Sequence, residues 1–131
     1  MKLIRIGDSL TFGYGVHLSQ RWTRLCAQET GWELVNEGIN GDTTGGMLAR
    51  MQGGVLAELR EGGLGADRPY VLLMGGSNDV FYSGSDAAAR GNMGAMIHQL
   101  FSVGVLPVVG IPLPADAPHA PRSILKRRSG R

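Results

Sequence analysis

The sequence predicts a three-layer α/β fold, in which helices cover both faces of a parallel sheet. Short β-prone runs alternate along the 131 residues with longer segments of helical spacing, in the order β-α-β-α-β-α-β. Right-handed crossovers turn such an alternation into a parallel sheet. Glycines cluster where the β-prone runs end, and ligands of open α/β sheets bind in loops at that end of the strands.

About four strands are expected. The predicted strands cover residues 2–6, 32–36, 70–74 and 105–111, and the first three stop at glycine-containing turns. The fourth run contains Pro107. Because proline cannot donate a ladder hydrogen bond, this run is predicted to lie at an edge of the sheet.

Three segments between the strands have helical spacing, at residues 18–30, 45–60 and 86–103. The pair Gly53-Gly54 weakens the second segment, and Asp86 is a candidate N-cap of the third. Each segment carries an apolar stripe that is predicted to pack in the core. The stripes consist of Trp22, Leu25 and Cys26 in the first segment, Met47, Met51, Val55 and Leu59 in the second, and Met93, Met96, Ile97 and Leu100 in the third.

Length and composition exclude several classes of protein. A chain of 131 residues and 13.9 kDa holds one domain at most. No apolar run approaches the roughly 18 residues of a membrane span, and the N-terminal apolar stretch is too short for a signal peptide, so a cytoplasmic location is expected. The single cysteine, Cys26, can form neither an internal disulfide nor a metal cluster, and no metal is expected.

The net charge of +2 is distributed unevenly along the chain. Residues 1–121 carry eight basic and eleven acidic side chains, a net charge of −3, whereas residues 122–131 carry five basic side chains and no acid. Such a run is typical of a solvated or disordered end, and contact with RNA or an anionic surface is the alternative. We therefore expect no nucleic-acid partner, one domain over residues 1–114, and a Pro/Ala-rich and then basic, disordered tail over residues 115–131.

The first predicted strand ends in Gly7-Asp8-Ser9-Leu10. A serine at a tight strand-to-helix turn can present its hydroxyl to solvent, while neighbouring backbone N–H groups point at an incoming acyl oxygen. This geometry suits a nucleophile. The alternative is that Ser9 only caps the turn.

Hydrogen-bond donors follow the next two strands. Gly41 offers a backbone N–H with no side chain in the way, and Asp42 or Thr43 could cap the helix that follows. Asn78 can offer a side-chain amide donor beside the first loop, or it can stabilise a turn, and the adjacent Asp79 is predicted to be mainly structural.

Together these three loops resemble the conserved blocks of the SGNH, or GDSL-type, hydrolase family in order, spacing and strand placement. The resemblance extends to about Pro114, and it is strongest to the small bacterial esterases with thioesterase and lysophospholipase activity. It implies a flavodoxin-like parallel sheet, with about four strands here where the family has five. The matching blocks are Gly7-Asp8-Ser9-Leu10, Gly41-Asp42-Thr43 and Gly76-Ser77-Asn78-Asp79.

The resemblance also implies a function and a set of site residues. Ser9 would be the nucleophile, and the backbone N–H groups of Ser9 and Gly41 would form an oxyanion hole with the amide of Asn78. Converging neutral donors stabilise the charge that develops on the carbonyl oxygen during acyl transfer. The expected reaction is hydrolysis of a small acyl ester or thioester through an acyl-serine intermediate, without a cofactor.

The family places its base in a DxxH block near the C-terminus. Asp116-Ala117-Pro118-His119 has this form but comes only 41 residues after Asn78, closer than the family usually has it. Either His119 is the base and Asp116 orients it, or the chain is truncated, the site is incomplete, and the domain only binds acyl or acetylated ligands. Loss of the fifth strand and the final helix would leave the fourth strand as an open edge, which invites self-association.

Overall fold

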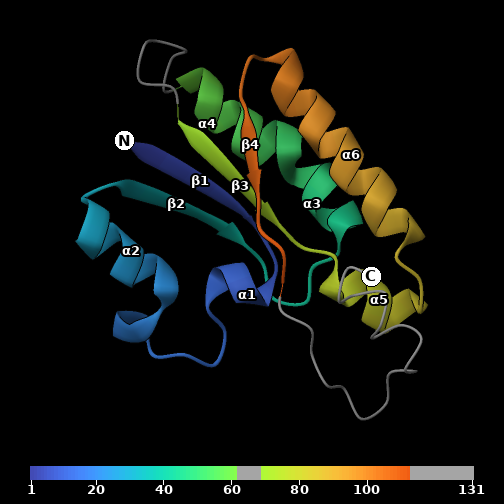
Figure 1. The fold of residues 1–131 in the computed structure, drawn as a ribbon, viewed down its shortest axis with the longest axis horizontal. Coiled ribbons are helices and arrows are strands. Elements are labelled where there is room, and N and C mark those ends of the chain that lie inside the picture. Colours follow the sequence, from blue (N-terminus) through green and yellow to red (C-terminus); the bar gives the residue numbers. More distant parts are fainter. Residues whose placement is uncertain (62–68, 113–131) are drawn as a thin grey trace.

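The computed structural model describes residues 1–61 and 69–112, and within them the chain forms an α/β fold around one sheet of four parallel strands, as the sequence predicts (Figure 1). The order of the strands across the sheet is β2-β1-β3-β4, so that Pro107 does lie in an edge strand. The strands are β1 (Lys2–Gly7), β2 (Glu33–Gly38), β3 (Tyr70–Met74) and β4 (Pro107–Val109).

The register of the sheet brings three strand ends level with one another. Gly7, the last residue of β1, pairs with Gly38 on β2 and with Met74 on β3. Because all three strands run in the same direction, the loops that follow them leave from one edge of the sheet. These are the three loops that carry the predicted site.

Helices lie on both sides of the sheet, and Figure 1 shows α2 apart from α3, α4 and α6. The chain passes from central β1 outward to β2 and then back across β1 to β3. Right-handed crossovers put the helices of these two connections on opposite faces. The helical elements are α1 (Ser9–Phe12), the 3₁₀ turn η1 (Leu18–Gln20), α2 (Trp22–Thr30), α3 (Thr44–Arg50), the π-helical η2 (Met51–Val55), α4 (Leu56–Glu61), α5 (Ser77–Ser83) and α6 (Ala87–Ser102).

One face of the sheet carries the hydrophobic core. Side chains alternate between the two faces along a strand, and on this face the apolar side chains of β1 and β3 are fully buried. The methionine-rich stripes of the second and third helical segments pack against them, as predicted. The core comprises Ile4, Ile6, Val71 and Leu73 from the strands, with Met47, Met51, Val55, Leu56, Leu59, Met96, Leu100 and Val105.

Two predicted helices differ from those observed. The segment predicted as a helix over residues 45–60 changes to π-helical geometry over Met51–Val55, which contains Gly53 and Gly54. Glycine has a low helix propensity, so this is where the backbone departs most easily from α-helical hydrogen bonding. The helix predicted from residue 18 begins at Trp22, because Arg21 has extended backbone angles.

The prediction that the stripe of the first helix packs in the core is wrong. On α2 only Thr23 is buried, while Trp22 is 38% and Leu25 is 48% exposed. The guanidinium of Arg5, on β1, lies 5.7 Å from the centre of the Trp22 indole ring. Trp22 thus meets a cation on this face of the sheet, and Leu25 remains exposed.

The short helices α1 and α5 were predicted as loops, and β4 is shorter than predicted. Local signals account for both helices: the carboxylate of Asp8 accepts a hydrogen bond from the N–H of Leu10 at the start of α1, and left-handed Gly84 ends α5. Strand β4 keeps three residues of the predicted 105–111, because it pairs with β3 alone. No helix in the described ranges is long and apolar enough to cross a membrane.

Candidate active site

Ser9 is the first residue of α1 and lies directly after β1 in a tight strand-to-helix turn. Asp8, which is 1% exposed, caps this helix with a hydrogen bond of 2.9 Å from the N–H of Leu10 to its Oδ1. Ser9 itself is half-buried. The buried cap fixes the turn and leaves the serine at the surface of the site.

Two glycines allow α1 to lie directly on the strand ends. A Cβ at Gly7 would overlap Thr11 Oγ1 and the carbonyl oxygen of Met74, and one at Gly38 would come within 2.6 Å of the backbone nitrogen of Phe12. Any larger residue at either position would push the turn that carries Ser9 away from β2 and β3.

The Gly41 loop follows β2 at the same edge of the sheet. Gly41 has a positive φ of 75°, which favours glycine, and it is exposed. A Cβ there would lie 3.4 Å from the hydroxyl oxygen of Tyr82, which comes from α5. Of the two candidate caps, Thr43 caps α3 by accepting a 3.3 Å hydrogen bond from the N–H of Gly46.

Asn78 meets the Gly41 loop directly. Its amide nitrogen Nδ2 donates a hydrogen bond of 2.8 Å to the carbonyl oxygen of Asp42, the residue that follows Gly41. An amide nitrogen carries two hydrogens, so one can hold the loop while the other is offered to a different acceptor. The structure therefore brings Asn78 and the Gly41 segment together, although they are 36 residues apart in the chain.

Asp79 links α5 to the start of α3. Its carboxylate is 6% exposed and accepts hydrogen bonds from the backbone N–H of Thr44 at 2.8 Å and from the Thr44 hydroxyl at 2.7 Å. The same hydroxyl accepts a bond of 3.1 Å from Asn92 on α6. Asp79 thus packs three helices together, in agreement with its predicted structural role.

Arg50 is a site residue that the sequence reasoning missed. Its guanidinium donates to Asp42 Oδ2 from Nε at 3.1 Å and from Nη2 at 2.6 Å. It also donates to the carbonyl oxygens of Glu37 at 2.7 Å and of Gly7 at 3.3 Å. The signal in the sequence was an arginine eight residues after Asp42, at the end of an otherwise apolar helix.

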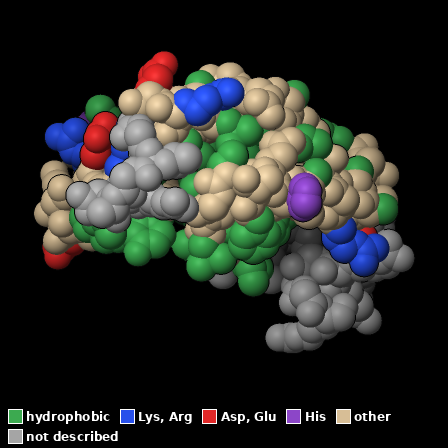
Figure 2. Space-filling model, turned by 90° about the horizontal axis from the view of Figure 1, so that it is seen from above, with side chains coloured by type: hydrophobic (Ala, Val, Ile, Leu, Met, Phe, Trp, Pro, Cys, Tyr) green, Lys and Arg blue, Asp and Glu red, His purple; other side chains and the backbone are tan. Residues whose placement is uncertain are grey.

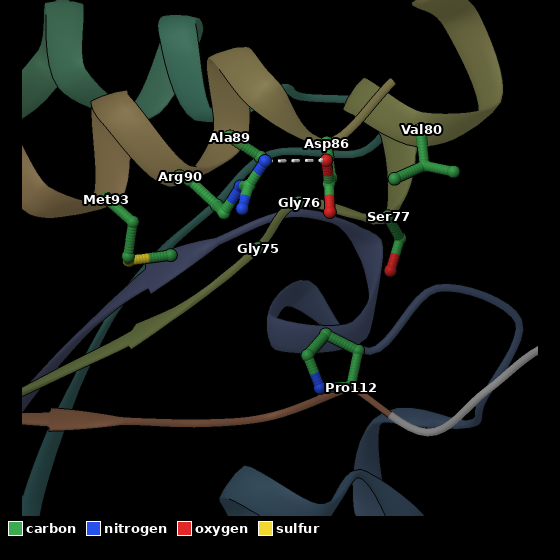
Figure 3. Close-up of a pocket in the computed structure, with 9 residues that line it drawn as sticks. All are labelled: Gly75, Gly76, Ser77, Val80, Asp86, Ala89, Arg90, Met93 and Pro112. Carbon is green, nitrogen blue, oxygen red and sulfur yellow. Dashed lines mark ion pairs between the residues drawn. The ribbon is translucent and has the colours of Figure 1, made fainter. Parts of the chain in front are cut away.

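A cavity of about 220 Å³ lies beside the Asn78 loop. In Figure 3 the residues of the β3–α5 loop and of α6 line one side, and Pro112 lies across from them. Val80 and Met93 contribute apolar surface, and an ion pair of 3.4 Å joins Asp86 to Arg90 at the wall. Asp86 occupies the N-cap position of α6, as predicted, but its side chain pairs with Arg90 and makes no capping hydrogen bond.

The two residues predicted as the base pair, Asp116 and His119, lie outside the described residues. Of the histidines inside them, His17 contacts Ser19 Oγ at 2.9 Å in an exposed turn, and His98 lies on α6. Neither is among the residues that form the contacts at the strand ends. Within residues 1–61 and 69–112 no group of three or more potential metal ligands is present.

Comparison with known proteins gives one family. A model of the family described as "GDSL-like Lipase/Acylhydrolase family" matches residues 6–130. The chain is 30% identical over 129 residues to Esterase TesA from Pseudomonas aeruginosa, which corresponds to 93% of this chain and 59% of that esterase. The chain therefore spans less than two thirds of the length of this curated relative.

Solved structures agree with the family match. A structure from Desulfitobacterium hafniense, assigned to the G-D-S-L family of lipolytic proteins, has a TM-score of 0.79 and 26% identity, over 98% of this chain and 68% of that one. A lipase/acylhydrolase from Enterococcus faecalis has a TM-score of 0.72 and 27% identity, over 98% and 67% of the two chains. Since the family model spans nearly all of the sequence, and since relatives of known structure share the fold, the chain belongs to the GDSL-like lipase/acylhydrolase family.

Proposed function

We propose that this chain hydrolyses carboxylic esters or thioesters with Ser9 as the nucleophile. One observation carries the proposal: the loops of Ser9, Gly41 and Asn78 follow three strands whose ends are level, and Asn78 is hydrogen-bonded to the residue beside Gly41. Donors from three neighbouring loops can converge on a single oxygen atom. The family membership supports ester hydrolysis in general.

In the proposed reaction, Oγ of Ser9 forms a bond to the acyl carbon and gives up its proton. The carbonyl oxygen becomes an oxyanion, which accepts hydrogen bonds from the backbone N–H groups of Ser9 and Gly41 and from Nδ2 of Asn78. Collapse of this intermediate breaks the bond to the leaving alcohol or thiol, which takes up a proton. Water then attacks the acyl-serine, releasing the acid and restoring Ser9.

The proposed reaction needs a base that accepts the proton of Ser9. His119 would accept the Ser9 proton and return it to the leaving group, with Asp116 orienting the imidazole. The alternative is a domain in which this pair does not reach Ser9, and which binds acyl or acetylated ligands with little turnover. Serine without an adjacent base is a weak nucleophile, so the two cases differ in rate.

The cavity beside Asn78 supports a small acyl group as the substrate. It begins at Gly76 and Ser77, the residues that precede Asn78, and continues between the side chains of Val80 and Met93. An acyl chain that enters it would exchange water for apolar contacts while its carbonyl carbon stays near the strand ends.

A fluorophosphonate probe, with mass-spectrometric mapping of the labelled peptide, tests the nucleophile. We expect the label on Ser9, its loss in Ser9→Ala, and its retention in the matched control Ser83→Ala, where the removed hydroxyl bonds the backbone carbonyls of Asp79 and Ser85 and the N–H of Ser85. A label on Ser77 or Ser83 would contradict the assignment of Ser9.

Turnover of p-nitrophenyl acetate, butyrate and octanoate separates the enzyme from the binding domain. A positioned general base contributes roughly 10²–10⁴-fold, so a loss of this size in His119→Ala would identify His119 as the base. A change within about threefold, well below that range, would favour the incomplete site. Comparison of the three esters reports the length of acyl chain that the site accepts.

A further inference from the structure

We propose that Arg50 is a positioning residue that holds the oxyanion donors of Gly41 and Asn78 in place. The proposal rests on the proposed function. It concerns a side chain that reaches neither the acyl carbon nor the oxyanion in the reaction above, and that would act through Asp42.

The guanidinium of Arg50 contacts three segments of the chain. Arg50 is the last residue of α3, and it donates to the backbone of β1 at Gly7, to the backbone of β2 at Glu37, and to the carboxylate of Asp42. A guanidinium is rigid and planar and carries five N–H groups, so it can donate hydrogen bonds in three directions at once. Arg50 therefore connects the ends of β1 and β2 with the Gly41 loop.

Asp42 links Arg50 to Asn78. Its carboxylate is held by Arg50, with a shorter distance of 2.6 Å, while its backbone carbonyl accepts the 2.8 Å bond from Asn78 Nδ2. A shift of Asp42 would move the N–H of the adjacent Gly41 and release the Asn78 amide together. Both donors thus depend on the same ion pair.

The ion pair between Arg50 and Asp42 is largely shielded from solvent. The side chains of Arg50 and Asp42 are 22% and 15% exposed, so water screens their attraction less than that of a surface pair. Charge-assisted hydrogen bonds of this length are stronger than neutral ones. The contact can therefore hold the Gly41 loop in one position.

The first test measures position without relying on activity. The side-chain amide signals of Asn78 are recorded by ¹⁵N–¹H NMR and assigned by their loss in Asn78→Ala. In Arg50→Met we expect them to move toward the position of a solvent-exposed asparagine amide. In the matched control Arg60→Met they should stay, because Arg60 is exposed on α4 and, among the described residues, hydrogen-bonds the carbonyl of Gln52 and not the Gly41 loop.

The second test is a double-mutant cycle on kcat. Asn78→Ala alone should lower kcat by about 10²–10³, the usual loss for one oxyanion donor. Misplacement of that donor in Arg50→Met should cost up to about 10²-fold in kcat while KM stays within about threefold, and Arg50→Lys should recover part of the loss. The double variant should be little worse than Asn78→Ala, because both changes remove the same interaction.

Two results would overturn the proposal. One is an unchanged Asn78 amide signal in a folded Arg50→Met, and the other is a double variant whose loss is the product of the two single losses. If Arg50→Met does not fold, Asp42→Asn replaces it: this variant keeps the carbonyl that Asn78 uses and removes the charge that Arg50 holds, and an unchanged signal there overturns the proposal equally. A wild-type chain that neither turns over esters nor reacts at Ser9 removes the proposed function, while the NMR comparison still decides the role of Arg50.

Discussion

The two faces of the sheet are built from the same strands but differ sharply in burial. On one face Ile4, Ile6, Val71 and Leu73 are completely inaccessible to solvent. On the other, Leu3 and Leu72 are half-buried and Val108 is 50% exposed. Alternation along each strand thus separates a closed apolar face from an open one.

The open face is nevertheless apolar. A hollow on it is lined by Leu3, Trp32, Tyr70, Leu72 and Val108, and the rings of Trp32 and Tyr70 stack with their centres 5.7 Å apart. Hydrophobic side chains also reach the surface in the space-filling view, where they gather along its lower side (Figure 2). Exposed apolar surface of this kind marks a place where further contacts can form.

The faces of the sheet and the ends of its strands have different roles in this molecule. The closed face supplies the core, and Lys2, Ile4 and Ile6 all point toward it from β1. The candidate site lies at the ends of the strands, and its hydrogen bonds involve neither face. Changes on the faces should therefore alter folding and association, whereas changes at the strand ends should alter the proposed esterase activity.

The largest effect is expected from truncating neighbouring leucines of β3. Leu73→Ala should lower the free energy of unfolding by about 2–5 kcal/mol, because it leaves a cavity in the closed core. Leu72→Ala, the matched change on the open face, should cost at most about 1 kcal/mol, since the side chain of Leu72 is already partly exposed to solvent. Urea unfolding measures both, and equal losses would show that the open face is as well packed as the closed one.

Replacing Arg5 is expected to change the free energy of unfolding by a smaller amount and in the opposite direction. Its guanidinium is 3% exposed, and within the described part of the chain its Nη1 atom has no hydrogen-bond partner. Burial lowers the pKa of Arg5, which means that the charged form is disfavoured there. Arg5→Met should raise the free energy of unfolding by about 1 kcal/mol or more, because it removes a desolvated charge and keeps an apolar stem.

Thermal and urea unfolding of Arg5→Met check this prediction. Loss of stability would mean that the contact with Trp22 and the 3.4 Å bond from Arg5 Nε to the carbonyl of Val35 outweigh the cost of desolvation. Lys2→Met serves as the control, since Lys2 has its own acidic partner on the other face.

Self-association through the edge strand β4 remains a prediction. Val108→Lys puts a charge on the open face of this strand and should weaken association by about tenfold or more, equivalent to about 1.4 kcal/mol. Light scattering over a concentration series measures the effect. Val16→Lys, at an exposed position in the loop after α1, should leave association unchanged, and equal behaviour of the two variants would argue against β4 as the contact.

The smallest effect is expected at the ion pair that joins the start of β1 to α4 on the closed face. Lys2 Nζ lies 2.9 Å from Glu58 Oε2, and both side chains are partly exposed, so Glu58→Gln should cost about 0.5 kcal/mol. The hydrogen bond to Glu58 raises the pKa of Lys2 above its usual 10.5. The contribution is therefore complete below pH 10.5 and disappears as the pH rises through the higher value of the folded state.

Unfolding free energies of the wild type and Glu58→Gln at pH 7 and above pH 10.5 check both the size and the sign. The difference between the two proteins should shrink at the higher pH. A difference that grows at the higher pH would contradict the raised pKa of Lys2. Glu29→Gln, at an exposed position on α2, is the control for the effect on stability of replacing a surface glutamate.

The sequence by itself determined the class of fold, the four strands and the family. These follow from local signals: alternation of strand and helix patterns, Pro107 at an edge, and glycine-containing blocks at the strand ends. It also determined that Asn78 and Gly41 belong to loops at one edge, because parallel strands share a direction. Local backbone chemistry is sufficient for such conclusions.

Only the tertiary structure decided which side chains meet. The bond from Arg50 to the carbonyl of Gly7 spans 43 residues, and no spacing in the sequence marks it. The exposure of Leu25 likewise depends on what lies opposite α2, since an apolar stripe has the same pattern whether or not a partner covers it. Asp116 and His119 stay predictions for a related physical reason: their contact with Ser9 depends on the path of the chain after β4, and no local pattern defines that path.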